Sequence, residues 1–234
     1  MQDPHSDSSP LNVESTPMLK RILMAAVIFV VLGGVTTYFL ALDGGIEEQY
    51  GATEGLEEDA SATADAFDIK DYTVATSQQE GFSTFQQNAA GFQMDFPEDW
   101  TYEAYSSVIP VMFRSPSEGQ TEGFVENVVI SLEDVSAYEG LTLDQYADAA
   151  YGQLLSAFPD YRLLQREKRQ LGTYDGMFLV GSYPADENNV VQVMSLFSIV
   201  DNMVYVFTYT HGDGEEDQFA TTVDAMISSF TVMK

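Results

Sequence analysis

The chain has 234 residues, and its 37 acidic residues against 9 lysines and arginines give a formal charge of −28. Such an acidic chain repels phosphate backbones, which excludes a nucleic-acid partner. It has no cysteine, so disulfides, thiolate metal sites, iron–sulfur clusters and cysteine nucleophiles are excluded. Only His5 and His211 are available for histidine chemistry, whereas a hydrophobic content of 45% suffices for a folded core.

An uncharged run of 21 residues, 22–42, dominates the N-terminal part of the sequence. At about 1.5 Å per helical residue it reaches roughly 30 Å, the thickness of the hydrocarbon core of a bilayer. Lys20 and Arg21 precede the run and acidic residues follow it, and positive charge is retained on the cytoplasmic side. We therefore predict a cytoplasmic tail (1–17), one transmembrane helix (18–42) and an extracytoplasmic remainder at the cell membrane.

A cleaved secretory signal is the alternative to a retained anchor, because translation from Met18 would begin with a basic leader. Such a signal has a shorter apolar stretch of about 7–15 residues and ends in an A-x-A-like cleavage site. The sequence shows no such site after the run, which favours the anchor.

Residues 43–90 contain eleven acidic residues and a single basic residue, Lys70, in a stretch rich in Ala, Thr, Ser and Gly. Like charges repel one another, and the segment has little apolar surface to offset the entropy of ordering. We predict an acidic, flexible tether that holds the next domain away from the membrane. A calcium loop of the D-x-[DN]-x-[DN]-G type is absent, so the acidity alone does not indicate a calcium site.

A folded domain is predicted over 91–234, because apolar and polar residues begin to alternate in the stretch 92–96. Further strands are predicted at 111–113, 127–132, 161–171, 177–183, 190–200 and 203–210. The last of these is apolar on both faces, which places it near the centre of a sheet. Asp201 and Asn202 precede it and tolerate the positive φ of a tight hairpin turn.

Two helices are predicted within this domain. Thr142 and Gln145 form a capping-box pattern ahead of an apolar stripe at helical spacing, which predicts a helix over 142–158. A final helix is predicted to begin at Asp213 or Gly214, with acidic residues in its first turn, where the helix dipole favours negative charge. Together these elements predict an α+β domain in which an antiparallel sheet is flanked by helices.

Several short motifs occur in the order found in one known family. The matching segments are 91–100 (GFQMDFPEDW), 111–116 (VMFRSP), 127–130 (NVVI), 141–146 (LTLDQY), 171–176 (LGTYDG) and 228–230 (SSF). On these motifs, residues 91–232 resemble the PsbP-like superfamily, which includes the DcrB-like and Mog-type proteins.

The resemblance implies an α/β/α sandwich that faces a lumen, the periplasm or the exterior. Family members are small accessory domains, and some help to assemble or stabilise photosynthetic complexes. The chain lacks the lipobox cysteine that anchors many bacterial relatives, and a transmembrane helix would take that role. It also lacks a recognisable transit peptide, which argues against an oxygen-evolving role. The resemblance identifies a type of accessory domain but does not indicate a reaction.

The basic residues of the domain are concentrated in one predicted strand, which carries Arg162, Arg166, Lys168 and Arg169. Strand parity predicts that the first three share one face. They could form a docking patch for an acidic partner or an anionic headgroup. The alternative is that they protect an edge strand from edge-to-edge pairing, which is the commoner use of such charges.

The other candidate sites have simpler structural explanations. Trp100 and Tyr102 could bind an aromatic ligand, but a lone tryptophan after a proline turn typically anchors a core. His211 beside an acidic cluster could indicate a divalent metal, although helix capping explains the acids. Asp144 and Asp148 lie one helical turn apart, but no base or nucleophile accompanies them, which favours an exposed helix face. No catalytic residue, metal site or cofactor is predicted.

These features predict a single-pass membrane protein whose PsbP-like accessory domain lies outside the cytoplasm. Its expected role is non-catalytic binding, assembly or stabilisation of another membrane or envelope protein complex. The alternative is a small-ligand or divalent-metal-binding domain for uptake or sensing, anchored or secreted. A carboxylate-rich surface poor in lysine suits a salt-rich setting, so we also hypothesise a halophilic or marine microbe. A melting temperature unchanged from low to molar salt would contradict that hypothesis.

Overall fold

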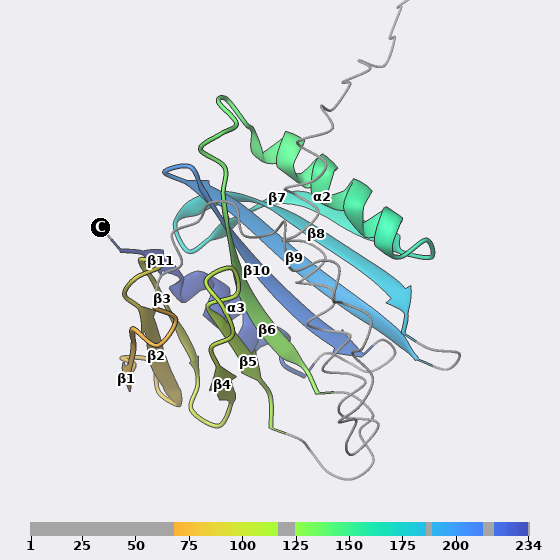
Figure 1. Ribbon diagram of the computed structural model, residues 1–234. Helices are drawn as coiled ribbons and strands as arrows, with labels where there is room; N and C mark the ends of the chain where they lie inside the picture. The colour runs from red at the N-terminus through yellow and green to blue at the C-terminus, as the bar shows by residue number, and fades with distance from the viewer. Residues whose placement is uncertain (1–67, 117–124, 186–188, 213–217, 234) are drawn as a thin grey trace, which may run out of the picture.

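The computed structural model of the chain describes residues 68–116, 125–185, 189–212 and 218–233. These residues form two antiparallel sheets and two helices, which confirms the predicted α+β class (Figure 1). The predicted cytoplasmic tail and transmembrane helix lie outside the described residues. Of the helices within the described ranges, none has the length and apolar character that crossing a membrane requires.

The larger sheet has seven strands in the order β4-β5-β6-β10-β9-β8-β7, each antiparallel to its neighbours. Its strands are β4 (Thr101–Glu103), β5 (Val111–Arg114), β6 (Asn127–Asp134), β7 (Arg162–Leu171), β8 (Tyr174–Pro184), β9 (Val190–Val200) and β10 (Met203–Gly212). Strands β5 to β10 agree with the strands predicted from the sequence. The central position of β10 is also the predicted one, because a strand that is apolar on both faces is covered on both.

A second sheet has four strands in the order β1-β2-β3-β11. Its strands are β1 (Tyr72–Thr76), β2 (Phe82–Gln87), β3 (Phe92–Pro97) and β11 (Thr231–Val232). The predicted tether over 43–90 is therefore wrong for residues 72–76 and 82–87, which pair into this sheet. The inward positions of β2 are Ser83, Phe85 and Gln87, so the strand lacks the apolar alternation that would have marked it. Residues 43–67 lie outside the described residues.

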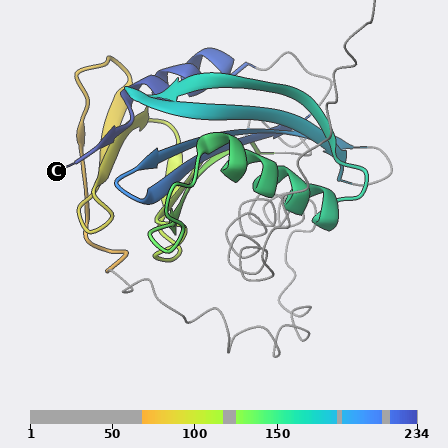
Figure 2. The same ribbon diagram turned by 90° about the horizontal axis from the view of Figure 1, so that it is seen from above.

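Helix α2 (Leu143–Ala157) covers one face of the larger sheet (Figure 2). It begins at the predicted capping box. The Thr142 hydroxyl accepts a hydrogen bond from the backbone N–H of Gln145, and the Gln145 side chain accepts one from the backbone N–H of Thr142. Its inward side chains pack on strands β8, β9 and β10 and are Tyr146, Ala147, Ala150 and Leu154.

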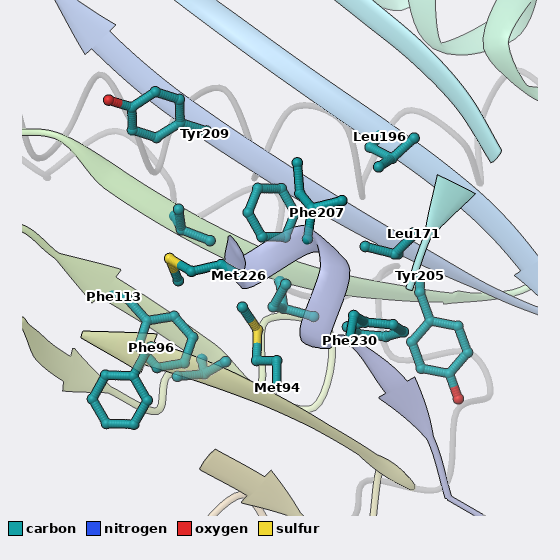
Figure 3. Packing of buried hydrophobic residues seen from close by; sticks show 14 of the residues in the cluster. Met94, Phe96, Phe113, Leu171, Leu196, Tyr205, Phe207, Tyr209, Met226 and Phe230 are labelled. Atoms are coloured by element: carbon teal, nitrogen blue, oxygen red, sulfur yellow. The ribbon is translucent and has the colours of Figure 1, made fainter. Parts of the chain in front are cut away.

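Helix α3 (Ala220–Ser229) and the smaller sheet together cover the opposite face (Figure 2). Figure 3 shows Met226 of α3 close to Phe207 of β10, with Met94 of β3 on its other side. The larger sheet therefore has a helix on each face, as predicted, and the smaller sheet is an addition that was not predicted.

The start of α3 also differs from the prediction. Its N-cap is Phe219, and no acidic residue lies in its first turn. The predicted caps Asp213 and Gly214 are therefore wrong, and residues 213–217 lie outside the described residues. The helix begins where apolar side chains can pack on the core, because packing of an apolar face supplies most of the stability of a short helix.

Candidate functional site

The four basic residues of the predicted docking patch lie on β7, at one edge of the larger sheet. Among the described residues, β7 pairs with β8 and has no strand on its other side. A strand in this position exposes unpaired backbone groups, and charged side chains prevent another chain from pairing with them. The four basic residues therefore lie on an edge strand, as expected if their charges protect that edge from pairing.

The predicted common face of Arg162, Arg166 and Lys168 is wrong, because β7 contains a bulge at Leu164. One extra residue moves every residue beyond it to the other face of the strand. Arg162 therefore lies on the side of α3, whereas Arg166 and Lys168 lie on the side of α2. No single face of β7 presents the predicted group of three cations.

Two of the four cations of β7 are bound by the flanking helices. Arg166 lies 2.5 Å from a carboxylate oxygen of Asp148 and 3.4 Å from one of Asp144, so the predicted exposed carboxylates of α2 hold this guanidinium. Arg169 lies 2.6 Å from a carboxylate oxygen of Asp224 on α3. The Arg166 pairs connect β7 to α2 on one face of the sheet, and the Arg169 pair connects it to α3 on the other. Exposed pairs of this kind contribute about 0.2–1 kcal/mol each to the stability of the fold.

The remaining two cations, Arg162 and Lys168, form no ion pair with any described residue. They lie on opposite faces of the strand, on either side of the bulge. The bulge residue Leu164 is 57% exposed. This edge is therefore protected in two ways, by charge and by a bulge that interrupts regular pairing.

Trp100 and His211 have structural roles. Trp100 is buried and its ring meets Phe219 edge-on with 5.3 Å between centroids, which confirms the predicted core anchor. His211 is buried and stacks on Tyr209 at 5.3 Å. Within the described ranges, no three metal-ligating side chains are placed to hold an ion. The acidic neighbours of His211 at 213–217 lie outside those ranges.

A buried carboxyl group that the sequence did not point to lies under α2. Glu133 of β6 is 6% exposed, and one of its oxygens accepts a hydrogen bond of 2.8 Å from the hydroxyl of Tyr146 on α2. Its other oxygen and the nearby Tyr138 hydroxyl are buried without a hydrogen-bond partner among the described residues. Burial raises the pKa of Glu133 to about 7, and the Tyr146 hydrogen bond only partly offsets this rise.

Burial also raises the pKa values of the two tyrosines near Glu133. Burial and then the Glu133 carboxylate raise the pKa of Tyr146 well above its usual value, and the same two causes raise the pKa of Tyr138. Among the described residues, Glu133 forms no ion pair with a lysine or arginine that would offset the cost of burying its charge. Sequence parity with Val129 and Ser131 was the available signal for its inward position.

Taken together, the described residues define a class of protein: an α+β domain built on antiparallel sheets. The family model of the PsbP-like proteins matches residues 50–232. The chain belongs to the PsbP-like family. The match begins at residue 50, whereas the motifs of the sequence resemblance begin at residue 91. It therefore also includes the strands of the smaller sheet. A search of the curated proteins finds no match to the chain.

Three solved structures are similar to this chain. The cyanobacterial PsbP protein (CyanoP) of Synechocystis is 16% identical with a TM-score of 0.50, covering 68% of this chain and 97% of that chain. LpqN of Mycobacterium tuberculosis, described as involved in cell envelope biogenesis, is 16% identical with a TM-score of 0.46, covering 70% and 91%. The yeast Ran-binding protein Mog1p is 12% identical with a TM-score of 0.49, covering 65% and 96%. At these identities a match bears on the fold alone, and only the CyanoP match, with its TM-score of 0.50, supports it.

Proposed function

We propose that the protein is a membrane-anchored, extracytoplasmic accessory subunit whose PsbP-like domain binds another membrane or envelope protein. The domain acts by binding and carries out no reaction of its own. One observation carries the proposal: the family match over 50–232 begins a few residues after the uncharged run 22–42, which is long enough to cross a bilayer. The run would hold a domain of this family at the surface of the membrane.

The partner is expected to be found by crosslinking the full chain in its native membranes. The proposal predicts that the domain is crosslinked reproducibly to one membrane or envelope protein. Crosslinking that yields only the protein itself, or a different set of abundant proteins in every experiment, would contradict a specific binding role.

The basic residues of β7 provide a charge-reversal test. We expect the double variant R162E and K168E to retain the crosslinked partner, because the fold already uses the charge of this strand to protect an edge. The variant leaves the ion pairs of Arg166 and Arg169 with the helices intact, so its melting temperature should change little. If the partner is lost while the fold is retained, the docking surface lies on β7 after all.

A further inference from the structure

The exposed edges of the two sheets are protected unequally. The larger sheet ends at β4, with three residues, and at β7, which carries four cations and a bulge. The smaller sheet ends at β11, with two residues, and at β1, with five. The sequence of β1 is YTVAT, without charge, proline or a bulge. Natural proteins normally block an edge of this kind.

The outward backbone groups of β1 follow from its hydrogen bonds to β2. The N–H of Asn88 donates to the carbonyl of Asp71, and the N–H of Ser77 donates to that of Phe82. Groups that face the neighbouring strand alternate along an antiparallel strand. The N–H and C=O groups of the intervening residues therefore point away from β2, where no described strand pairs with them: Tyr72, Val74 and Thr76.

The apolar core reaches the surface beside this edge. The side chain of Val74 lies on the same face as its buried partner Phe85, and Tyr72 stacks on Phe85 at 5.1 Å. Tyr102 of β4 meets the Tyr72 ring edge-on at 5.9 Å. Val74 is 39% exposed and Tyr102 is 38% exposed. A strand added to β1 would cover both with its inward side chains.

The charge around β1 limits what that strand can be. Asp68, Asp71 and Glu80 flank β1 and outnumber Lys70, and the chain as a whole carries −28. A second copy brings the same negative charge, and the stretch 43–67 contains acidic residues without any lysine or arginine. Both would meet like charge at this edge, whereas a segment with basic flanks would be attracted.

We propose that β1 is a docking edge to which an extended segment of a partner protein adds as a fifth strand, with alternating apolar residues and basic flanks. Main-chain hydrogen bonds to Tyr72, Val74 and Thr76 supply affinity, and the inward side chains of the segment pack on Val74 and Tyr102. This inference rests on the proposed binding role and names the surface that carries it.

The test uses the full chain in detergent micelles and the fluorescent peptide KKTVTVTVKK, with binding followed by anisotropy. The peptides EETVTVTVEE and KKTVPVTVKK are controls for charge and for backbone pairing. We expect saturable binding of the first peptide and none of the controls. V74P removes one outward donor but no hydrogen bond to β2, so it should weaken binding at least tenfold. V74A keeps that donor and should weaken it less.

Three results would overturn the proposal that β1 is a docking edge for a partner segment. Equal binding by V74P and the unaltered chain would show that the peptide binds elsewhere. Absence of binding while membrane crosslinking still captures a partner would reject β1 and leave the proposed function standing. A dimer that V74P converts to a monomer would assign the edge to a second copy. Melting curves exclude misfolding, and T76P, which removes another outward donor, provides an independent variant.

Discussion

Replacing Gly172 by alanine is expected to lower the free energy of unfolding by at least about 3 kcal/mol. This loss corresponds to a melting temperature about 6–12 °C lower. Gly172 lies in the β7–β8 turn with φ of +58°, a conformation that L side chains rarely adopt. An added Cβ would overlap the carbonyl oxygen of Phe230 and lie 3.0 Å from its carbonyl carbon. The N–H of Gly172 also donates to the carbonyl of Ile227 at 2.8 Å, so the turn anchors the end of α3.

Two glycines provide matched controls in thermal unfolding. Gly140 has φ of +75° with open space around it, so G140A isolates the backbone cost, expected at about 1–2 kcal/mol. Gly152 lies within α2 with open space and an ordinary φ, so G152A should stabilise the protein by about 0.5–1 kcal/mol. A G172A protein that melts no lower than G140A would contradict the close contact between this turn and α3.

Replacing Glu133 by glutamine is expected to remove a pH dependence of stability. The folded state holds the Glu133 proton more tightly than the unfolded chain, because burial raises its pKa from 4.5 to about 7. The contribution of this group is therefore fully present below pH 4.5 and is lost as the pH rises to about 7. Relative to the unaltered protein, E133Q should gain about 3 kcal/mol of stability between pH 4 and pH 8.

Chemical denaturation across that pH range measures the difference directly. Glu139 is exposed, so E139Q removes the same formal charge from the surface and controls for the net charge of the protein. The difference between the two variants isolates the burial of Glu133. If the E133Q and E139Q curves run parallel from pH 4 to pH 8, Glu133 is solvated in the folded protein and its placement under α2 is wrong.

The elements predicted correctly are those whose signals are local. The capping box at Thr142 and Gln145 requires only residues within one turn of α2. Asp201 and Asn202 have φ of 50° and 65°, as the turn before β10 requires. The apolar residues on both faces of β10 reflect coverage by α2 on one side and by α3 and the smaller sheet on the other.

The elements that were missed depend on partners distant in the sequence. The bulge at Leu164 exists only in relation to the register of β8, so parity counted along β7 placed Arg162 on the wrong face. Strands β1 and β2 carry little apolar alternation and follow an acidic stretch, so composition assigned them to a tether. Strand parity places the Glu133 side chain on one face of β6, but its burial also depends on where α2 crosses that face, which parity does not specify.

Labelling of single cysteines can test whether the run 22–42 holds the domain on the outer side of a membrane, since the chain has no cysteine of its own. Ser156 is exposed on α2, and Ser8 lies in the predicted cytoplasmic tail. With a membrane-impermeant maleimide, we expect S156C to be labelled on intact cells and S8C only after lysis. Labelling of S156C only after lysis would contradict the proposed topology and the function built on it.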